Sequence, residues 1–317
     1  MRRGFTLVEL LVAIMVSSII LLAIASLFMG SNRAFRVNRD VAEMSEDVRN
    51  AITTLEFIFS RWGAGVPCAN NNCNITNSIP DCTGVIVSSL NNSIPPTYAP
   101  PSDPMCMSVI SELSIGQPLG QPQVSNTYVI FYANLYGIGF VVSTNGNNAN
   151  VLSCRLSSNQ RQNCYYVWRN GNVKGSFYTD NHGNTVPVPV RLSQFSGQPD
   201  CIQGHQVNLT INTAVNRIVN AGDDITLEPG DYITRVPHRV TIYLSNNQER
   251  TPSGVTYRWL LMDRVDLAQA CNDTETAIRI GRVQNFSVQR QGRSVVVNAT
   301  FVSADGRTYP ITRIYGR

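Results

Sequence analysis

The chain has 317 residues, of which 43% are hydrophobic and 15% charged, enough for one large or two modest hydrophobic cores. Its formal net charge is +4. Without Arg2 and Arg3 near its start the net charge would be +2, which is too close to neutral for a general electrostatic attraction to nucleic acid, so no nucleic-acid partner is predicted.

The first thirty residues join a short basic leader to an apolar run of about 25 residues, long enough to cross a bilayer as a helix. Glu9 is the one charged residue inside this run. A carboxylate in hydrocarbon costs about 2.5–3.5 kcal/mol, so a cationic partner is expected for it. An α-amine created by cutting the chain between Gly4 and Phe5 would provide that cation.

Residues 3–9, Arg-Gly-Phe-Thr-Leu-Val-Glu, resemble the type III signal of type IV pilins and of type II secretion pseudopilins. The resemblance implies that a prepilin peptidase removes residues 1–4 and methylates Phe5. Residues 5–30 then stay on the protein as a transmembrane helix and later as part of the filament core. An uncleaved signal anchor is the alternative, whereas an ordinary signal peptide would lose its apolar segment at a small-residue site.

The resemblance gives Glu9 a role in assembly. Its carboxylate would pair with the Phe5 α-amine of a neighbouring subunit, so that the N-terminal helix binds other minor and major pilins. The alternative is a Glu9 that only reaches the membrane interface. Before assembly, the resemblance implies a single-pass inner-membrane protein with its head outside the cytoplasm; afterwards, the protein lies in an extracellular pilus or a periplasmic pseudopilus.

Apolar residues continue beyond residue 30 at steps of three or four, which is typical of a helix with one apolar face. They are Val37, Val41, Met44, Val48, Ile52, Leu55, Phe59 and Trp62. The period predicts that residues 31–62 form the amphipathic half of the same helix, about 58 residues and about 87 Å long in all. No proline interrupts it, and the sequence Gly-Ala-Gly-Val-Pro at 63–67 predicts its end.

Residues 68–122 are rich in Asn, Ser, Pro and Cys, and only Gly84–Leu90 and Met107–Leu113 are apolar enough for strands. A loop region of this length is usually functional or cross-linked. The chain has eight cysteines, all beyond the apolar helix: Cys68, Cys73, Cys82, Cys106, Cys154, Cys164, Cys201 and Cys271. An even number in an exported domain predicts disulfides, which favours cross-linking.

We expect the pairs Cys154–Cys164, across a hairpin, and Cys201–Cys271, as a long clamp. The other four cysteines would then pair among themselves. There is no Cys-x-x-Cys motif, and the three histidines show no ligand spacing to the cysteines. The sequence therefore predicts neither a metal site nor a cofactor.

The remainder of the chain predicts strands separated by turns. Strands are expected at Tyr128–Tyr132, Ile138–Ser143, Tyr165–Arg169, Val173–Tyr178, Gln206–Ile211, His238–Ser245, Thr256–Asp263, Val283–Arg290, Ser294–Val302 and Thr308–Tyr315. Asn170-Gly171 is a strong hairpin signal, and turns are expected at Gln291-Gly292 and Asp305-Gly306. The unbroken run Val295–Val297 indicates a strand buried on both faces.

Other candidate sites have weaker signals. The acidic group Asp223, Asp224, Glu228 and Asp231 lacks the alternating ligand spacing of a calcium loop, so a solvated turn is the preferred interpretation. His205 and His238 come with no Gly-x-Ser-x-Gly motif, so an enzyme is not predicted. Aromatic residues gather around Trp168 and include Tyr165, Tyr166 and those of 128–136. The preferred interpretation is that they belong to the hydrophobic core, and the alternative is a sugar-binding platform.

The predicted fold class is therefore α+β, with a long N-terminal helix packed on an antiparallel β-sheet head at 63–317, as in pilins. Segments 31–39 and 61–68 resemble PilW-type minor pilins, and the C-terminal meander, which ends at 313–317, resembles the closing strands of the J-type pseudopilin. The resemblance implies a structural minor pilin near the pilus tip that primes or supports assembly. The alternatives are a type II secretion minor pseudopilin and a pilus-tip adhesin with 68–122 as its contact surface.

Overall fold

The computed structural model describes residues 46–68, 73–74, 76–82, 101, 103–111, 127–145, 148–154, 156, 164–175, 177–179, 185–190, 195–196, 206–210, 227–266 and 274–316. Within them, a single helix at 46–60 precedes 17 strands. The expected α+β class is wrong, because the described part is mainly β. The expectation gave the N-terminal helix too much weight, and its segment before residue 46 lies outside the described residues.

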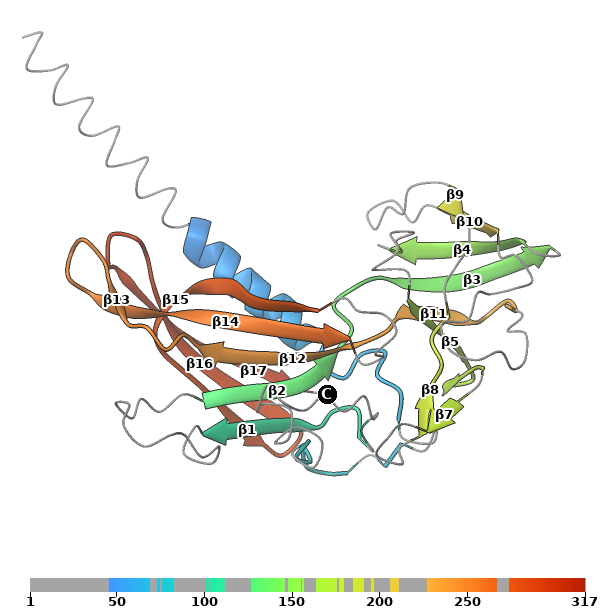
Figure 1. The fold of residues 1–317 in the computed structure, drawn as a ribbon, viewed down its shortest axis with the longest axis horizontal. Coiled ribbons are helices and arrows are strands. Elements are labelled where there is room, and N and C mark those ends of the chain that lie inside the picture. The colour runs from blue at the N-terminus through green and yellow to red at the C-terminus, as the bar shows by residue number, and fades with distance from the viewer. Residues whose placement is uncertain are drawn as a thin grey trace, which may run out of the picture.

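A large antiparallel sheet carries the helix on one face (Figure 1). Its strands, in spatial order, are β1 (Met107–Ser111), β2 (Thr127–Ala133), β12 (His238–Leu244), β14 (Thr256–Asp266), β15 (Glu275–Gln291), β16 (Ser294–Val302) and β17 (Thr308–Gly316). A short strand, β13 (Glu249–Arg250), pairs with β14. We call the helix together with this sheet the head lobe.

A second antiparallel sheet lies beside the head lobe (Figure 1). Its order is β6 (Asn172–Val173), β5 (Tyr165–Arg169), β11 (Tyr232–Arg235), β3 (Ile138–Asn145), β4 (Asn148–Cys154), β10 (Gln206–Thr210) and β9 (Phe195–Ser196). Strands β7 (Phe177–Thr179) and β8 (Thr185–Pro187) form a separate pair.

In the sequence, the strands of the second sheet are inserted between two neighbouring strands of the first. Strands β2 and β12 are antiparallel neighbours, and Ala133 at the end of β2 pairs with His238 at the start of β12. The chain leaves the large sheet through residues 134–137 and returns through 236–237. We call the described residues between these two crossings, with their sheet, the inserted lobe.

The core of the head lobe forms between the helix and the large sheet. The buried helix residues are Val48, Ala51, Leu55, Ile58, Phe59 and, just beyond its end, Trp62. Phe59 lies between two aromatic rings, 5.2 Å from that of Phe131 and 4.9 Å from that of Tyr315. The apolar face of the helix therefore reaches both β2, next to one edge of the sheet, and β17 at the opposite edge.

Most of the predicted strands within the described residues are found, including the C-terminal meander β15–β16–β17. Asn170 and Gly171 adopt positive φ angles of 53° and 78° at the predicted hairpin, a region that glycine and asparagine favour. The strand at Val295–Val297 is not buried on both faces, because Val296 is only partly buried between two buried valines. One side of β16 is buried and the other is only partly buried, so burial alternates along the strand.

Candidate assembly surface

The processing and assembly residues Gly4, Phe5 and Glu9 lie outside the described residues. Nothing in the structure therefore tests their predicted roles. Among the described residues, no helix combines the length and the apolar character that crossing a bilayer requires. What the structure does show is the surface where this helix meets the large sheet.

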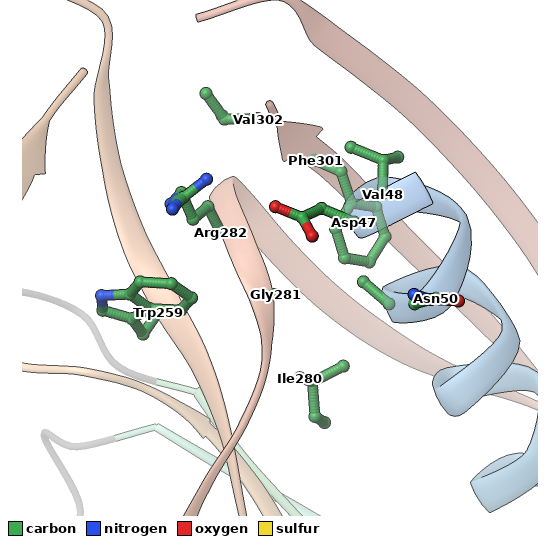
Figure 2. A pocket seen from close by; sticks show the side chains of 10 residues that line it. Asp47, Val48, Asn50, Trp259, Ile280, Gly281, Arg282, Phe301 and Val302 are labelled. Carbon is green, nitrogen blue, oxygen red and sulfur yellow. The ribbon is translucent and has the colours of Figure 1, made fainter. Parts of the chain in front are cut away.

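A pocket of about 240 Å³ opens between the first described turns of the helix and strands β14 to β16 (Figure 2). Its floor is apolar and consists of Val48, Ala51, Ile280, Phe301 and Val302. Its rim carries two opposite charges, Asp47 on the helix and Arg282 on β15. An apolar floor with a mixed polar rim suits a protein side chain better than a small ion.

The Arg282 side chain also belongs to an aromatic cluster on the large sheet. The ring of Trp259 has two guanidinium groups over it, Arg279 at 4.6 Å and Arg282 at 5.0 Å. Glu249 accepts hydrogen bonds from Tyr257 and from the Trp259 indole, at 2.6 and 3.2 Å. Cation–π contacts and these hydrogen bonds hold the rim of the pocket in place.

Two disulfides brace the segment that follows the helix. Cys68 is bonded to Cys73 and Cys82 to Cys106, so this group of four cysteines pairs within itself. Cys164 is also disulfide-bonded. Cys201 and Cys271 lie outside the described residues, and the pairs Cys154–Cys164 and Cys201–Cys271 remain predictions.

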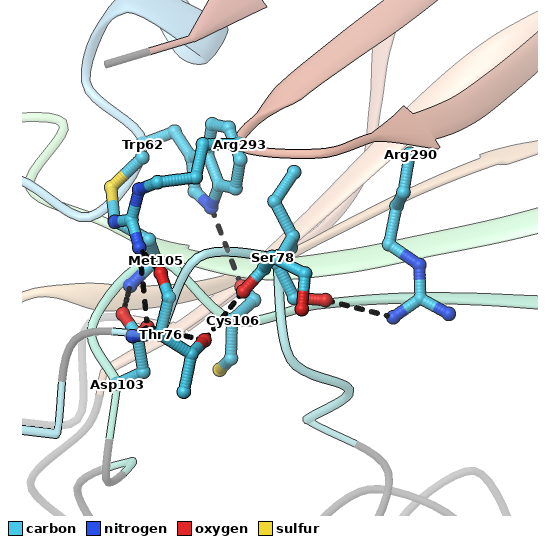
Figure 3. A network of polar contacts seen from close by, with 9 residues as sticks. Trp62, Thr76, Ser78, Asp103, Met105, Cys106, Arg290 and Arg293 are labelled. Carbon is cyan, nitrogen blue, oxygen red and sulfur yellow. Dashed lines mark hydrogen bonds and ion pairs between the residues drawn. The ribbon is translucent and has the colours of Figure 1, made fainter.

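Polar contacts tie this braced segment to the turn between β15 and β16 (Figure 3). The guanidinium of Arg290 donates to the carbonyl of Met107 at 3.1 Å, and that of Arg293 donates to the carbonyl of Thr76. The buried carboxylate of Asp103 accepts from the backbone of Met105 at 2.8 Å and lies 3.9 Å from Arg293. Segments about 200 residues apart in the chain are thereby fixed to each other.

The two lobes meet at a buried cluster of charged residues. Arg235, at the end of β11, lies 3.5 Å from the carboxylate of Asp266 and donates to the carbonyl of Cys164 at 3.0 Å. His238, at the start of β12, lies 3.1 Å from the same carboxylate. All three side chains are almost completely buried, and the Tyr136 ring lies against Arg235 and His238.

The acidic group expected to be a solvated turn is held by an arginine. Arg169 donates through two nitrogens to Asp231, each at 2.8 Å, and also contacts Glu228. Hydrogen bonding to Asp231 raises the pKa of Arg169. Asp223 and Asp224 lie outside the described residues, and within those residues no three His, Cys, Asp or Glu side chains are grouped to hold a metal ion.

The aromatic residues divide between the core and the surface. Tyr165 and Tyr166 are buried, while Trp168 is half-buried and its indole donates to Thr234 at 2.7 Å. The exposed rings of the inserted lobe are Phe140 and Tyr232, which sequence reasoning missed. Strand alternation around Phe140 could have shown that its side chain faces away from that of Val141, but not that this face stays open.

Comparison with known proteins identifies the N-terminal segment. Residues 1–25 match the model of the prokaryotic N-terminal methylation motif. This match supports a type IV pilin-like or pseudopilin protein, and the motif implies processing by prepilin peptidase and assembly with other pilins. It confirms that part of the prediction, while the resemblance to PilW-type proteins is left as a prediction.

An uncharacterised protein of Aquifex aeolicus (strain VF5) is 28% identical over 246 residues, covering 77% of this chain and 73% of the relative. No solved structure matches the chain. The similarity to the Aquifex protein extends well beyond the N-terminal motif, since the aligned length is about ten times that of the motif.

Proposed function

We propose that this chain is a structural minor pilin of the PilW type, incorporated near the tip of a type IV pilus to prime or support assembly. The N-terminal methylation motif at residues 1–25 carries the proposal. In this proposal the peptidase cuts after Gly4, Phe5 becomes the methylated N-terminus, and Glu9 pairs with the α-amine of a neighbouring subunit.

The size of the head supports a minor subunit. A bulk subunit repeats along the whole filament, so an extra lobe on it would have to be accommodated at every position. The inserted lobe adds a second sheet of seven strands beside the head lobe. A subunit with few copies at one end of the filament avoids that constraint.

The test is the substitution Glu9→Ala in the full chain. We expect normal cleavage and methylation of Phe5, measured by mass spectrometry of the mature N-terminus, but at least about tenfold less of the variant in sheared filaments, because an unpaired amine would be left in the apolar core. Glu46→Ala is the matched control, since Glu46 is an exposed acid at the start of the described helix. Normal incorporation of the Glu9 variant would contradict the proposed pairing.

The same motif also supports a type II secretion pseudopilin. Deletion of the gene separates the two functions. Loss of surface pili with intact protein export supports the pilin, whereas retained pili with failed export supports the pseudopilin.

A further inference from the structure

Of the two disulfides whose cysteines are both described, one has an exposed end. Cys73 is exposed, whereas its partner Cys68 is only 3% exposed; we call this bond the short-loop disulfide. In the other bond, the buried disulfide, Cys82 and Cys106 are 6% and 3% exposed and pack in an apolar cluster with Ile130. A thiolate opens a disulfide by attacking one of its sulfurs, so access decides which bond reacts. Of these two, the short-loop disulfide offers that access.

The chain on the Cys68 side of the short-loop disulfide is fixed by other contacts. The Gly63 amide donates to the carbonyl of Tyr132 at 2.8 Å. The Asn134 amide donates to the carbonyl of Ala64 at 3.1 Å. These hydrogen bonds hold the residues after the helix against the end of β2, where the chain crosses to the inserted lobe. Cys68 is therefore held near its position whether or not its disulfide is closed.

The chain beyond Cys73 has attachments of its own (Figure 3). The carbonyl of Thr76 accepts a hydrogen bond from Arg293. The Ile79 amide donates to the carbonyl of Gly292 at 3.0 Å. Both partners belong to the turn between β15 and β16. Opening the short-loop disulfide would thus release a short piece of chain and leave both of its ends in place.

The buried disulfide does not have this independence. It joins cysteines 24 positions apart, against five in the short-loop disulfide, and a bond that closes a longer loop stabilises a fold more. The carbonyl of Cys106 accepts a hydrogen bond from the buried Trp62 indole at 3.3 Å. Cys82 and Cys106 pack in a cluster that includes Tyr132 of the head lobe and Tyr166 of the inserted lobe. Opening this bond would therefore disturb the core.

We propose that Cys73 is a site of thiol–disulfide exchange with small thiols, and that the short-loop disulfide opens and closes while the rest of the fold stays intact. The thiolate of the small thiol attacks the Cys73 sulfur and forms a new disulfide with it. The bond to Cys68 breaks, and Cys68 leaves as a thiolate that takes a proton from water. Because its backbone stays anchored, Cys68 can attack the Cys73 sulfur in turn, which expels the small thiol and restores the original bond. This inference does not depend on the pilin assignment.

The test exposes the full oxidised chain, purified in detergent micelles, to a series of glutathione concentrations without denaturant. N-ethylmaleimide stops the exchange and marks free thiols, and mass spectrometry of peptic fragments locates the marked cysteines and the bound glutathione. We expect glutathione on Cys73 and not on Cys68. We also expect this bond to open at least about tenfold faster than the buried disulfide, which serves as a control within the same chain.

A double variant provides a second measurement. Cys68→Ser combined with Cys73→Ser should still fold, because the anchors on both sides of the loop remain, and circular dichroism measures this. The variant should bind no glutathione at Cys82 or Cys106 under the conditions that modify Cys73 in the unmodified chain.

Several results would overturn the proposal. One is a buried disulfide that opens as fast as the short-loop disulfide or faster. Another is a short-loop disulfide that opens only at urea concentrations that unfold the chain. Glutathione on Cys68 in place of Cys73 would mean that exposure does not direct the attack, and a double variant that fails to fold would mean that the anchors depend on the bond.

Discussion

Tyr132 on β2 shows how one buried hydroxyl affects stability. The side chain is 1% exposed, and within the described residues its hydroxyl oxygen has no hydrogen-bond partner. Burial raises the pKa of Tyr132 to about 12, against a smaller opposing effect of Arg239. A buried hydroxyl without a partner costs about 1–3 kcal/mol, so this residue supports the contact between the lobes through its ring alone.

We predict that Tyr132→Phe increases the free energy of unfolding at neutral pH by about 1 kcal/mol, because it removes the unsatisfied group. The folded pKa lies above the unfolded value of about 10. The stability linked to this proton is therefore complete below about pH 10 and is lost as the pH rises toward 12. The Phe variant should lose less stability over that range.

Urea unfolding of the full chain in detergent at pH 7 and pH 11 measures both effects. Tyr232→Phe is the control, since Tyr232 is 51% exposed and neither effect is expected there. A Tyr132→Phe variant that is clearly less stable than the unmodified chain at pH 7 would show that the hydroxyl has a partner.

At the scale of elements, the helix packs closely against the large sheet at Gly281 of β15. A Cβ atom built on Gly281 would lie 2.7 Å from the Cβ of Ala51 and 3.1 Å from the Phe301 ring. Real Cβ atoms do not approach another carbon to 2.7 Å, so a larger residue at this position would force the helix or β15 to shift. The same approach forms part of the pocket floor beside Val48.

We predict that Gly281→Ala lowers the free energy of unfolding by about 1–3 kcal/mol through overpacking against the helix. Combining it with Ala51→Gly should recover part of the loss, although glycine inside a helix costs about 1 kcal/mol by itself. A double-mutant cycle of chemical unfolding measures the coupling. Purely additive effects of the two substitutions would mean that the helix does not press on β15 here.

At the scale of the whole molecule, the two lobes are joined by two adjacent crossings and one buried ionic cluster. Asp266 is the common partner of Arg235 and His238, and all three lie where the chain passes between the sheets. Removing one member of a buried charge pair leaves the other uncompensated, which costs about 3–5 kcal/mol. This junction holds the inserted lobe in one orientation on the head lobe.

We predict that Asp266→Asn lowers the free energy of unfolding by about 3 kcal/mol or more and speeds limited proteolysis at the crossings 134–137 and 236–237. Glu275→Gln is the matched control. Glu275 pairs with Arg264 on the neighbouring strand, but its side chain is 52% exposed, so the expected change is below about 1 kcal/mol. Equal effects of the two substitutions would contradict a special role of the junction.

The sequence by itself determined the features that depend on neighbouring residues. Spacing of three or four from Val48 to Trp62 predicts the buried helix face, and Asn170-Gly171 predicts a hairpin, because both signals are local. The N-terminal methylation motif at residues 1–25 likewise needs no knowledge of the fold.

Only the tertiary structure decided which strands are neighbours and which faces stay open. The pairing of Ala133 with His238 joins positions about 100 residues apart, and no local pattern encodes a lobe inserted between them. Alternation assigns Phe140 and Val141 to opposite faces, but what covers each face is a property of distant residues. For the same reason Val296, within an unbroken valine run, lies on the less buried side of β16.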